Sequence, residues 1–154
     1  MPYFAAALAR SPAGWTAYEV DLAGVADVDE LAELVRDLTG DAGTSVLFVE
    51  EDDEYVGIVR VDAGDGEPRV FLSDARAAVA HPAAALLVQP AADADPPGFE
   101  IEPSGDADLL ADLGVPARDL LGLVTAEGEL PADVMVEICT RAGCADALEE
   151  LREG

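Results

Sequence analysis

Five stretches in the first half of the chain have the hydrophobic and polar pattern of β-strands. Two of them, residues 3–9 and 15–21, flank a Ser-Pro-Ala-Gly turn, and the second alternates polar with apolar side chains. Three more follow at 45–50, 55–61 and 69–73, joined by short polar connections. Connections this short suit antiparallel neighbours, because a parallel pair needs a crossover of about a dozen residues. The pattern predicts an antiparallel sheet whose last three strands form a meander.

A helix is predicted between the second and third strands, over residues 28–39. Asp27 stands at its N-cap position with Glu30 three residues later, the spacing of a capping box, and Gly40 is placed to end it. The apolar side chains recur at helical spacing, and this stripe should face the core. Its members are Val28, Leu31, Leu34, Val35 and Leu38.

The stretch after the last strand predicts a second helix. Ser73 and Asp74 can cap a helix that begins at Ala75, and Pro82 should break or kink it. The apolar run at residues 83–88 fits a strand and a helix equally well. The first 88 residues therefore predict an antiparallel sheet domain with one or two helices.

The amino-acid composition of the chain changes after residue 88. Residues 89–105 are rich in proline, aspartate and glutamate, which is typical of an extended or poorly ordered acidic linker. Residues 106–154 predict a small helical module, and about 50 residues are marginal for an independent core. The helices should pack on the sheet domain, on each other in a dimer, or on a partner. The complete prediction is an α+β fold made of a sheet domain (1–88), a linker (89–105) and a helical module (106–154).

Glycines and prolines mark the helix ends of this module. Gly114, Gly128 and Gly143 stand where helices should end, and Pro116 and Pro131 where helices should begin. Ten apolar residues are expected to face inward: Leu109, Leu110, Leu113, Leu120, Leu121, Val124, Val134, Ile138, Leu148 and Leu151.

Charge is the strongest feature of the composition. The chain carries 33 acidic residues against eight basic ones, all arginine, for a net charge of −25. A field of this sign repels phosphate backbones, so direct binding of nucleic acid is excluded. Two explanations stay open: the acidity serves solubility, or it steers the chain onto a basic partner. No apolar run approaches a membrane span, and no signal peptide is evident, so we expect a cytoplasmic protein.

Two clusters of charge are candidates for partner binding. One is an acidic run at a predicted hairpin tip, and the other is a pair of arginines around the last strand. The run lacks the spaced pattern of a calcium loop, and a solvated turn or an electrostatic recognition element is expected instead of a metal site. The arginines either neutralise nearby carboxylates or line a contact surface. The candidate residues are Glu50, Glu51, Asp52, Asp53, Glu54, Arg69 and Arg76.

No motif for catalysis or cofactor binding is recognisable. Cys139 and Cys144 form a single pair without nearby histidines, which is an incomplete zinc site. We expect both thiols to be buried, reduced and free of metal. His81 precedes Pro82 and lies far from either cysteine in the sequence, which makes it a poor catalytic base. The sequence therefore predicts a protein that is not an enzyme and needs no cofactor.

Several segments, in order along both halves of the chain, carry a resemblance to a known family. They are residues 48–55, 58–62, 69–77, 108–114 and 130–134, followed by Cys139, Gly143 and Cys144. In these segments the chain resembles the actinobacterial tRNA adenosine deaminase-associated protein family. The resemblance implies association with the enzyme that converts the tRNA wobble adenosine to inosine, and it supplies no catalytic residues. The chain itself lacks the H-x-E and P-C-x-x-C signatures of zinc deaminases.

Charge and resemblance together predict a non-catalytic partner or regulator of a basic RNA-handling protein, with tRNA adenosine deaminase as the first candidate. The alternative is a self-associating structural protein, such as a homodimer, whose acidity serves solubility. A metal-dependent enzyme built on the carboxylates at 50–54 is the least favoured.

Overall fold

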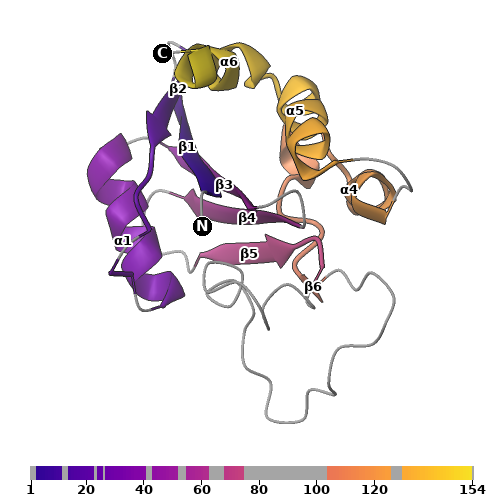
Figure 1. Cartoon of the computed structure of the whole chain (residues 1–154), viewed down its shortest axis with the longest axis horizontal. Helices are drawn as coiled ribbons and strands as arrows, with labels where there is room; N and C mark the ends of the chain where they lie inside the picture. The colour runs from indigo at the N-terminus through magenta and orange to yellow at the C-terminus, as the bar shows by residue number, and fades with distance from the viewer. Residues whose placement is uncertain are drawn as a thin grey trace, which may run out of the picture.

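The computed structural model describes residues 3–11, 14–22, 24–25, 27–40, 43–51, 55–62, 68–74, 104–125 and 130–153. Its six strands form one antiparallel sheet in the order β2-β1-β3-β4-β5-β6, with helices on both faces (Figure 1). The strands are β1 (Tyr3–Ser11), β2 (Gly14–Glu19), β3 (Thr44–Glu51), β4 (Tyr55–Asp62), β5 (Arg69–Leu72) and β6 (Ser104–Gly105). This arrangement confirms the α+β class and the predicted meander, in which β4 pairs with both β3 and β5.

Helix α1 (Val28–Thr39) packs on one face of the sheet. Its ends are those that the sequence predicts: the Asp27 carboxylate accepts a hydrogen bond from the Glu30 amide at 2.9 Å, and Gly40 ends the helix with a φ of 65°. The core on this face combines buried α1 residues with the strand side chains that alternate towards them. It comprises Ala5, Ala7, Val20, Leu22, Leu31, Ala32, Val35, Leu47, Val49, Tyr55, Val59, Val61, Val70 and Leu72. The predicted stripe is wrong only for Leu38, which is exposed at the end of the helix.

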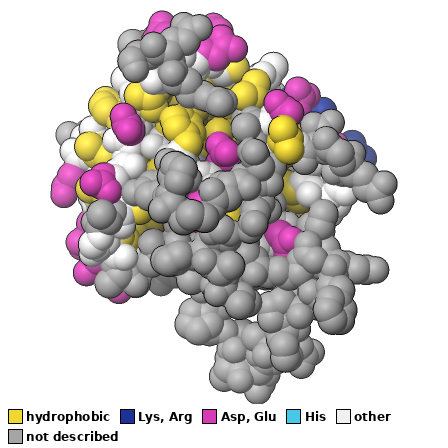
Figure 2. All heavy atoms as spheres, in the orientation of Figure 1, with side chains coloured by type: hydrophobic (Ala, Val, Ile, Leu, Met, Phe, Trp, Pro, Cys, Tyr) yellow, Lys and Arg dark blue, Asp and Glu magenta, His cyan; other side chains and the backbone are white. Residues whose placement is uncertain are grey.

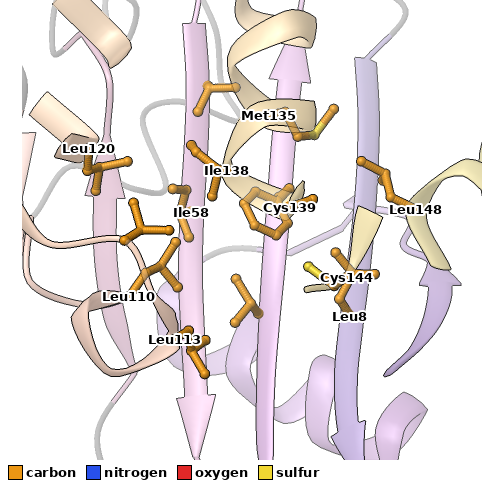
Figure 3. Packing of buried hydrophobic residues seen from close by; sticks show 14 of the residues in the cluster. Leu8, Ile58, Leu110, Leu113, Leu120, Met135, Ile138, Cys139, Cys144 and Leu148 are labelled. Carbon is orange, nitrogen blue, oxygen red and sulfur yellow. The ribbon is translucent and has the colours of Figure 1, made fainter. Parts of the chain in front are cut away.

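The C-terminal helices cover the opposite face (Figure 1). They are the 3-10 helix η1 (Ala111–Leu113), α4 (Ala117–Thr125), α5 (Pro131–Ala142) and α6 (Ala145–Glu153). Helix α5 packs on β3 and β4, and α6 packs on β1 and β2. Figure 3 shows Ile138 and Cys139 of α5 over the strands, with Cys144 and Leu148 beside Leu8. Of the three predicted packing arrangements, the structure shows helices on the sheet.

The helix boundaries in this half follow the predicted glycines and prolines, except that Gly128 lies outside the described residues. Pro131 is the first residue of α5, and Gly143 ends α5 with a φ of 88°. Seven of the ten leucine, valine and isoleucine positions expected to face inward are buried. Leu121 is 37% exposed, so its predicted burial is wrong. Helix α4 packs mainly against α5 and buries Leu120, and the next side chain along a helix points about 100° away.

Strand β6 joins the C-terminal half to the sheet through a glycine that no other residue could replace without strain. Gly105 lies opposite Phe71 with a φ of 101°, and a Cβ atom there would stand 2.2 Å from the Val70 carbonyl oxygen. Residues 104–105 are the end of the predicted linker. The rest of that linker, the helix predicted from Ala75 and the run at 83–88 lie outside the described residues. The division into domains stays a prediction.

Candidate partner-binding surface

The acidic run divides into residues with different surroundings. Glu50 and Glu51 end β3, while residues 52–54 lie outside the described part of the chain. Glu51 is only 5% exposed, and its carboxylate accepts a hydrogen bond from the Tyr55 hydroxyl at 3.0 Å. The expectation of a solvated turn is therefore wrong for Glu51, because the residue directly opposite in the β3–β4 register supplies a buried donor. Glu50 is half-buried.

The predicted arginine of β5 neutralises a nearby carboxylate. Arg69 Nε donates to Asp106 Oδ2 at 2.6 Å, and both side chains are partly exposed. This hydrogen bond holds the pKa of the Asp106 carboxyl below its usual value. The first of the two interpretations of Arg69 thus has a structural basis, and its role in partner binding stays a prediction. Arg76 lies outside the described residues.

A second arginine, which sequence reasoning did not single out, ties the C-terminal half to the sheet. Arg60 is buried on β4 and donates to the Leu109 carbonyl at 2.7 Å and to Asp62 at 3.0 Å. Both of its terminal nitrogens also donate to the Asp112 carboxylate, one of them at 2.8 Å. The hydrogen bond with Asp112 outweighs burial and raises the pKa of Arg60, and it lowers the pKa of Asp112. An arginine inside the apolar run of a central strand was the available signal.

Further ion pairs involve most of the arginine side chains that the structure describes. Arg141 on α5 donates to Glu137 at 3.1 Å and to Asp119 of α4 at 3.3 Å. Arg118 also lies 3.9 Å from the Asp119 carboxylate. The structure describes six arginine side chains, and those of Arg60, Arg69, Arg118 and Arg141 are paired with carboxylates of the same chain. Within the described residues, the exposed carboxylates therefore outnumber the exposed arginines.

Carboxylates dominate the exposed side chains on both faces of the sheet. Figure 2 shows acidic groups over α1 and around α6. The exposed carboxylates of these two helices are Asp29, Glu30, Glu33 and Asp37 on α1, and Asp146, Glu149 and Glu150 on α6. Asp29, Glu33 and Asp37 follow one another at four-residue spacing, so like charges are neighbours along the helix. None of these three pairs with an arginine in the described ranges.

The sheet register gathers another set of carboxylates at one end of the sheet: Glu19, Asp21, Glu50 and Glu51. This set, together with residues 52–54 that follow it in the sequence, is here called the acidic end. Glu19 lies opposite Ala6, which in turn lies opposite Phe48 of β3, and β3 ends at Glu51. The C-terminal ends of β2 and β3 therefore lie at the same end of the sheet. Glu19 and Asp21 are exposed there. Sequence reasoning missed this grouping because β1 separates the two strands.

The other candidate chemistry is limited to the two cysteines. Cys139 and Cys144 are buried, which confirms that part of the prediction, and the Cys144 amide donates to the Cys139 carbonyl at 2.8 Å. A hydrogen bond to Cys144 and burial raise the pKa of the Cys139 thiol. Their redox state stays a prediction.

No group of three or more metal-binding side chains converges among the residues that the structure describes. Within the same ranges, no helix has the length and apolar character needed to cross a bilayer.

Comparison with known proteins identifies a family. Residues 3–145 match the family model of the Rv3753c-like tRNA adenosine deaminase-associated protein. Searches of curated proteins and of solved structures find no match. The matched span runs from β1 to the first residue of α6 and so covers both the sheet and most of its helical cover. The chain belongs to the Rv3753c-like tRNA adenosine deaminase-associated protein family.

Proposed function

We propose that this protein is a non-catalytic accessory protein that binds a basic RNA-handling protein, with tRNA adenosine deaminase as the first candidate. The observation that carries the proposal is the difference between the arginines, most of which are paired in the described residues, and the carboxylates, many of which are exposed. At least four of the six described arginine side chains are held in internal ion pairs, while carboxylates of α1 and α6, and Glu19 and Asp21 of the acidic end, are exposed. The family name supports the deaminase as the partner.

Electrostatics explains how such a chain would recognise its partner. A protein that binds tRNA must present cationic side chains to the phosphates. A chain with a net charge of −25 is drawn to that surface, and steering of this kind raises association rates by roughly 10- to 1,000-fold at low salt. A protein bound there would compete with tRNA, so it would act as a regulator as well as a partner.

A binding titration at increasing salt tests the proposal. We expect the purified chain to bind the deaminase with micromolar or better affinity in 50 mM NaCl, and to lose affinity steeply towards 500 mM because the charges are screened. Added tRNA should displace it. Absence of a complex at low salt would refute direct association. Simultaneous binding of tRNA without mutual effect would refute occupancy of the RNA-binding surface.

The predicted site residues provide a sharper test, with one change that the structure requires. Glu51 is retained because it is buried against Tyr55. The four other carboxylates are replaced by their amides together: Glu50, Asp52, Asp53 and Glu54. A matched control neutralises four exposed carboxylates of α1: Asp29, Glu30, Glu33 and Asp37. If the acidic end forms the contact, the first variant weakens binding much more than the second. Equal effects would mean that net charge steers but the acidic end makes no contact.

The contribution of the two arginines to binding is tested separately. Arg69 is paired with Asp106, and its side chain is still partly exposed. We propose that Arg69 lines the contact surface while it remains in this pair. Arg69→Gln and Arg76→Gln should each weaken the complex if arginine side chains contact the partner. Unchanged affinity in both variants would restrict these residues to neutralising their own chain.

Self-association is the second candidate, and two exposed leucines favour it. Leu121 on α4 is 37% exposed, and Leu130 just before α5 is 49% exposed. Light scattering gives the test, because salt acts oppositely in the two cases. Two copies with a net charge of −25 each repel, so a homodimer would strengthen as salt rises, whereas binding to a basic partner weakens. A dimer that dissociates in the variant Leu121→Ser, Leu130→Ser would support this candidate, and a monomer at all salt concentrations would refute it.

A further inference from the structure

Strand β2 is the first strand of the sheet and has a neighbour on one side only among the described residues. The Val20 amide donates to the Ala5 carbonyl at 3.0 Å, which identifies position 20 as one that bonds to β1. Hydrogen-bonded positions alternate in an antiparallel pair, so the amides and carbonyls of Thr16 and Tyr18 also point to β1. The backbone groups of Trp15, Ala17 and Glu19 point to the outer edge.

Strand β2 shows none of the bulges, prolines or lysines that commonly protect an edge strand against strand addition. Natural edge strands are interrupted by bulges, prolines or lysines. The β1–β2 pairing instead runs through six consecutive pairs without a bulge, and β2 contains neither proline nor lysine. The only charge within β2 is Glu19. The edge therefore presents a regular row of donors and acceptors at the positions of Trp15, Ala17 and Glu19.

Exposed carboxylates at the end of β2 and on α6 determine which kind of strand this edge can accept. Helix α6 packs on β2, and its Glu149 and Glu150 are exposed, as are Glu19 and Asp21 at the end of the strand. A second copy of the chain would bring the same carboxylates together and be repelled. A cationic strand would be attracted. The negative charges thus protect the edge from self-pairing while leaving it open to a basic segment.

We infer that the outer edge of β2 accepts an extended, lysine- or arginine-bearing segment of a partner protein as a seventh strand. Side chains of an added strand alternate between the two faces. Those on the α6 face would lie beside Trp15 and Ala17, which pack on that face, and near the carboxylates of α6. The half-buried indole of Trp15 offers a surface for a cation. The preferred segment therefore carries a cationic residue at every second position.

The inference rests on the proposed function for the identity of the partner, while the edge can be tested with a peptide. The probe is an acetylated, amidated peptide of four Lys-Val repeats. Its control is the diastereomer that alternates D- and L-residues, which carries the same charge but forms no regular strand. Amide hydrogen exchange by NMR should show Trp15, Ala17 and Glu19 exchanging fast in the free protein. Exchange at these positions should slow at least tenfold with the L-peptide only.

Three results would overturn the inference. One is binding of the L-peptide without protection of the three amides. Another is equal affinity for both peptides, which would show that charge alone holds them. The third is protection that appears with rising protein concentration and no peptide, because a second copy would then occupy the edge.

A variant of the edge gives an independent test. Ala17→Pro removes an outward amide but no bond to β1, and proline is tolerated where the missing amide faces solvent. We expect it to weaken the L-peptide at least tenfold, while Ala17→Val leaves the affinity within twofold. Slow exchange at Thr16, Tyr18 and Val20 shows that β2 still pairs with β1. Unchanged affinity in folded Ala17→Pro would contradict the inference.

A pair of charge variants keeps the inference testable even if Ala17→Pro fails to fold. The variant Glu149→Gln, Glu150→Gln removes two carboxylates beside the edge, and Glu33→Gln, Asp37→Asn removes two from α1 on the other face. Only the first should weaken the L-peptide, by at least fivefold. Equal weakening would overturn the specific role of the edge.

Binding to the deaminase distinguishes a failure of the inference about the edge from a failure of the proposed function. If wild type and Ala17→Pro bind the deaminase equally, the inference about the edge fails and the proposed function stands. If the L-peptide protects the edge but the deaminase does not bind, the edge accepts a cationic strand and the proposed partner is wrong.

Discussion

Carboxylates have opposite roles in two regions of this molecule, the segment 104–113 and helix α1. In the segment, Asp106 meets Arg69 and Asp112 meets Arg60, and both pairs join the C-terminal half to the sheet. In α1, a row of carboxylates at four-residue spacing faces solvent. Its members are Asp29, Glu33 and Asp37.

The difference shows that net charge does not reveal where charge is available. In the segment, Asp106 and Asp112 form ion pairs that hold the fold together. In α1, adjacent like charges repel one another, which lowers the stability of the helix. A contact surface for a basic partner must come from regions of the second kind.

The largest effect is expected at Arg60. In Arg60→Met the buried Leu109 carbonyl loses its donor and Asp112 loses its partner. Leaving a buried acceptor unpaired costs about 1–3 kcal/mol, and the free energy of unfolding should fall by about this amount in urea denaturation. Arg118→Met is the control, because that side chain is 89% exposed and its removal should change stability by less than about 0.5 kcal/mol. Equal losses would show that the segment is not held by Arg60.

The next effect concerns the inward-facing carboxylate Glu51. Tyr55→Phe removes the hydroxyl that donates to it in the buried core. We expect a loss of about 1–2 kcal/mol in the free energy of unfolding, as for other buried polar groups that lose a partner. Tyr18→Phe, at a half-buried position of β2, should change stability by less than about 0.5 kcal/mol. If both variants have the free energy of unfolding of wild type, the hydrogen bond to Glu51 does not stabilise the fold, as expected for the solvated turn that the sequence predicts.

The pair of Arg69 and Asp106 should give a pH-dependent effect below about 1 kcal/mol, because both groups are partly exposed. Asp106 has a lowered pKa in the folded state, so its pair with Arg69 contributes stability above the unfolded-state pKa of about 3.9. This contribution is lost as pH falls through the lower folded-state pKa. The stability difference between wild type and Arg69→Met should therefore be present at pH 6 and shrink towards pH 2. Taking the difference removes the effect of overall charge repulsion, which also changes with pH. A difference that grows on acidification would contradict the assignment.

The contrast between local and long-range interactions explains which features the sequence predicts. Helix α1 was predicted to the residue because Asp27, Glu30 and Gly40 act within one turn of its ends. The antiparallel pairing of β3, β4 and β5 is predicted from the short connections between them. The sequence leaves the position of the C-terminal helices open among three arrangements, because this position depends on packing between segments far apart in the chain.

The candidate site shows the same limit. Arg60 and Asp112 are 52 positions apart, and no periodicity or spacing links them. The acidic end likewise depends on β1 lying between β2 and β3. The burial of Glu51 was within reach of local reasoning, since Tyr55 stands across a short hairpin with an aromatic hydroxyl to donate.

On α1, a charge reversal should stabilise the protein. Asp37 lies in the last turn of the helix, four residues after Glu33. In Asp37→Lys a like-charge neighbour becomes an attractive one in the favourable orientation, and a cation meets the negative end of the helix dipole. Together these should raise the free energy of unfolding by about 0.5–1 kcal/mol in low salt. The gain should largely vanish in 1 M NaCl, where charges are screened within about 3 Å.

Asp29→Lys is the matched control for this reversal. It makes the same change of net charge and also gains an attractive neighbour in Glu33, but it places a cation at the positive end of the helix dipole. We expect it to be neutral or slightly destabilising. Both variants should slow association with the deaminase equally and modestly, because steering follows net charge. If Asp37→Lys is no more stable than wild type in low salt, the carboxylates of α1 do not repel one another, and the contrast with segment 104–113 is lost. If Asp37→Lys alone abolishes binding, α1 contacts the partner directly, and the acidic end is not the principal contact surface.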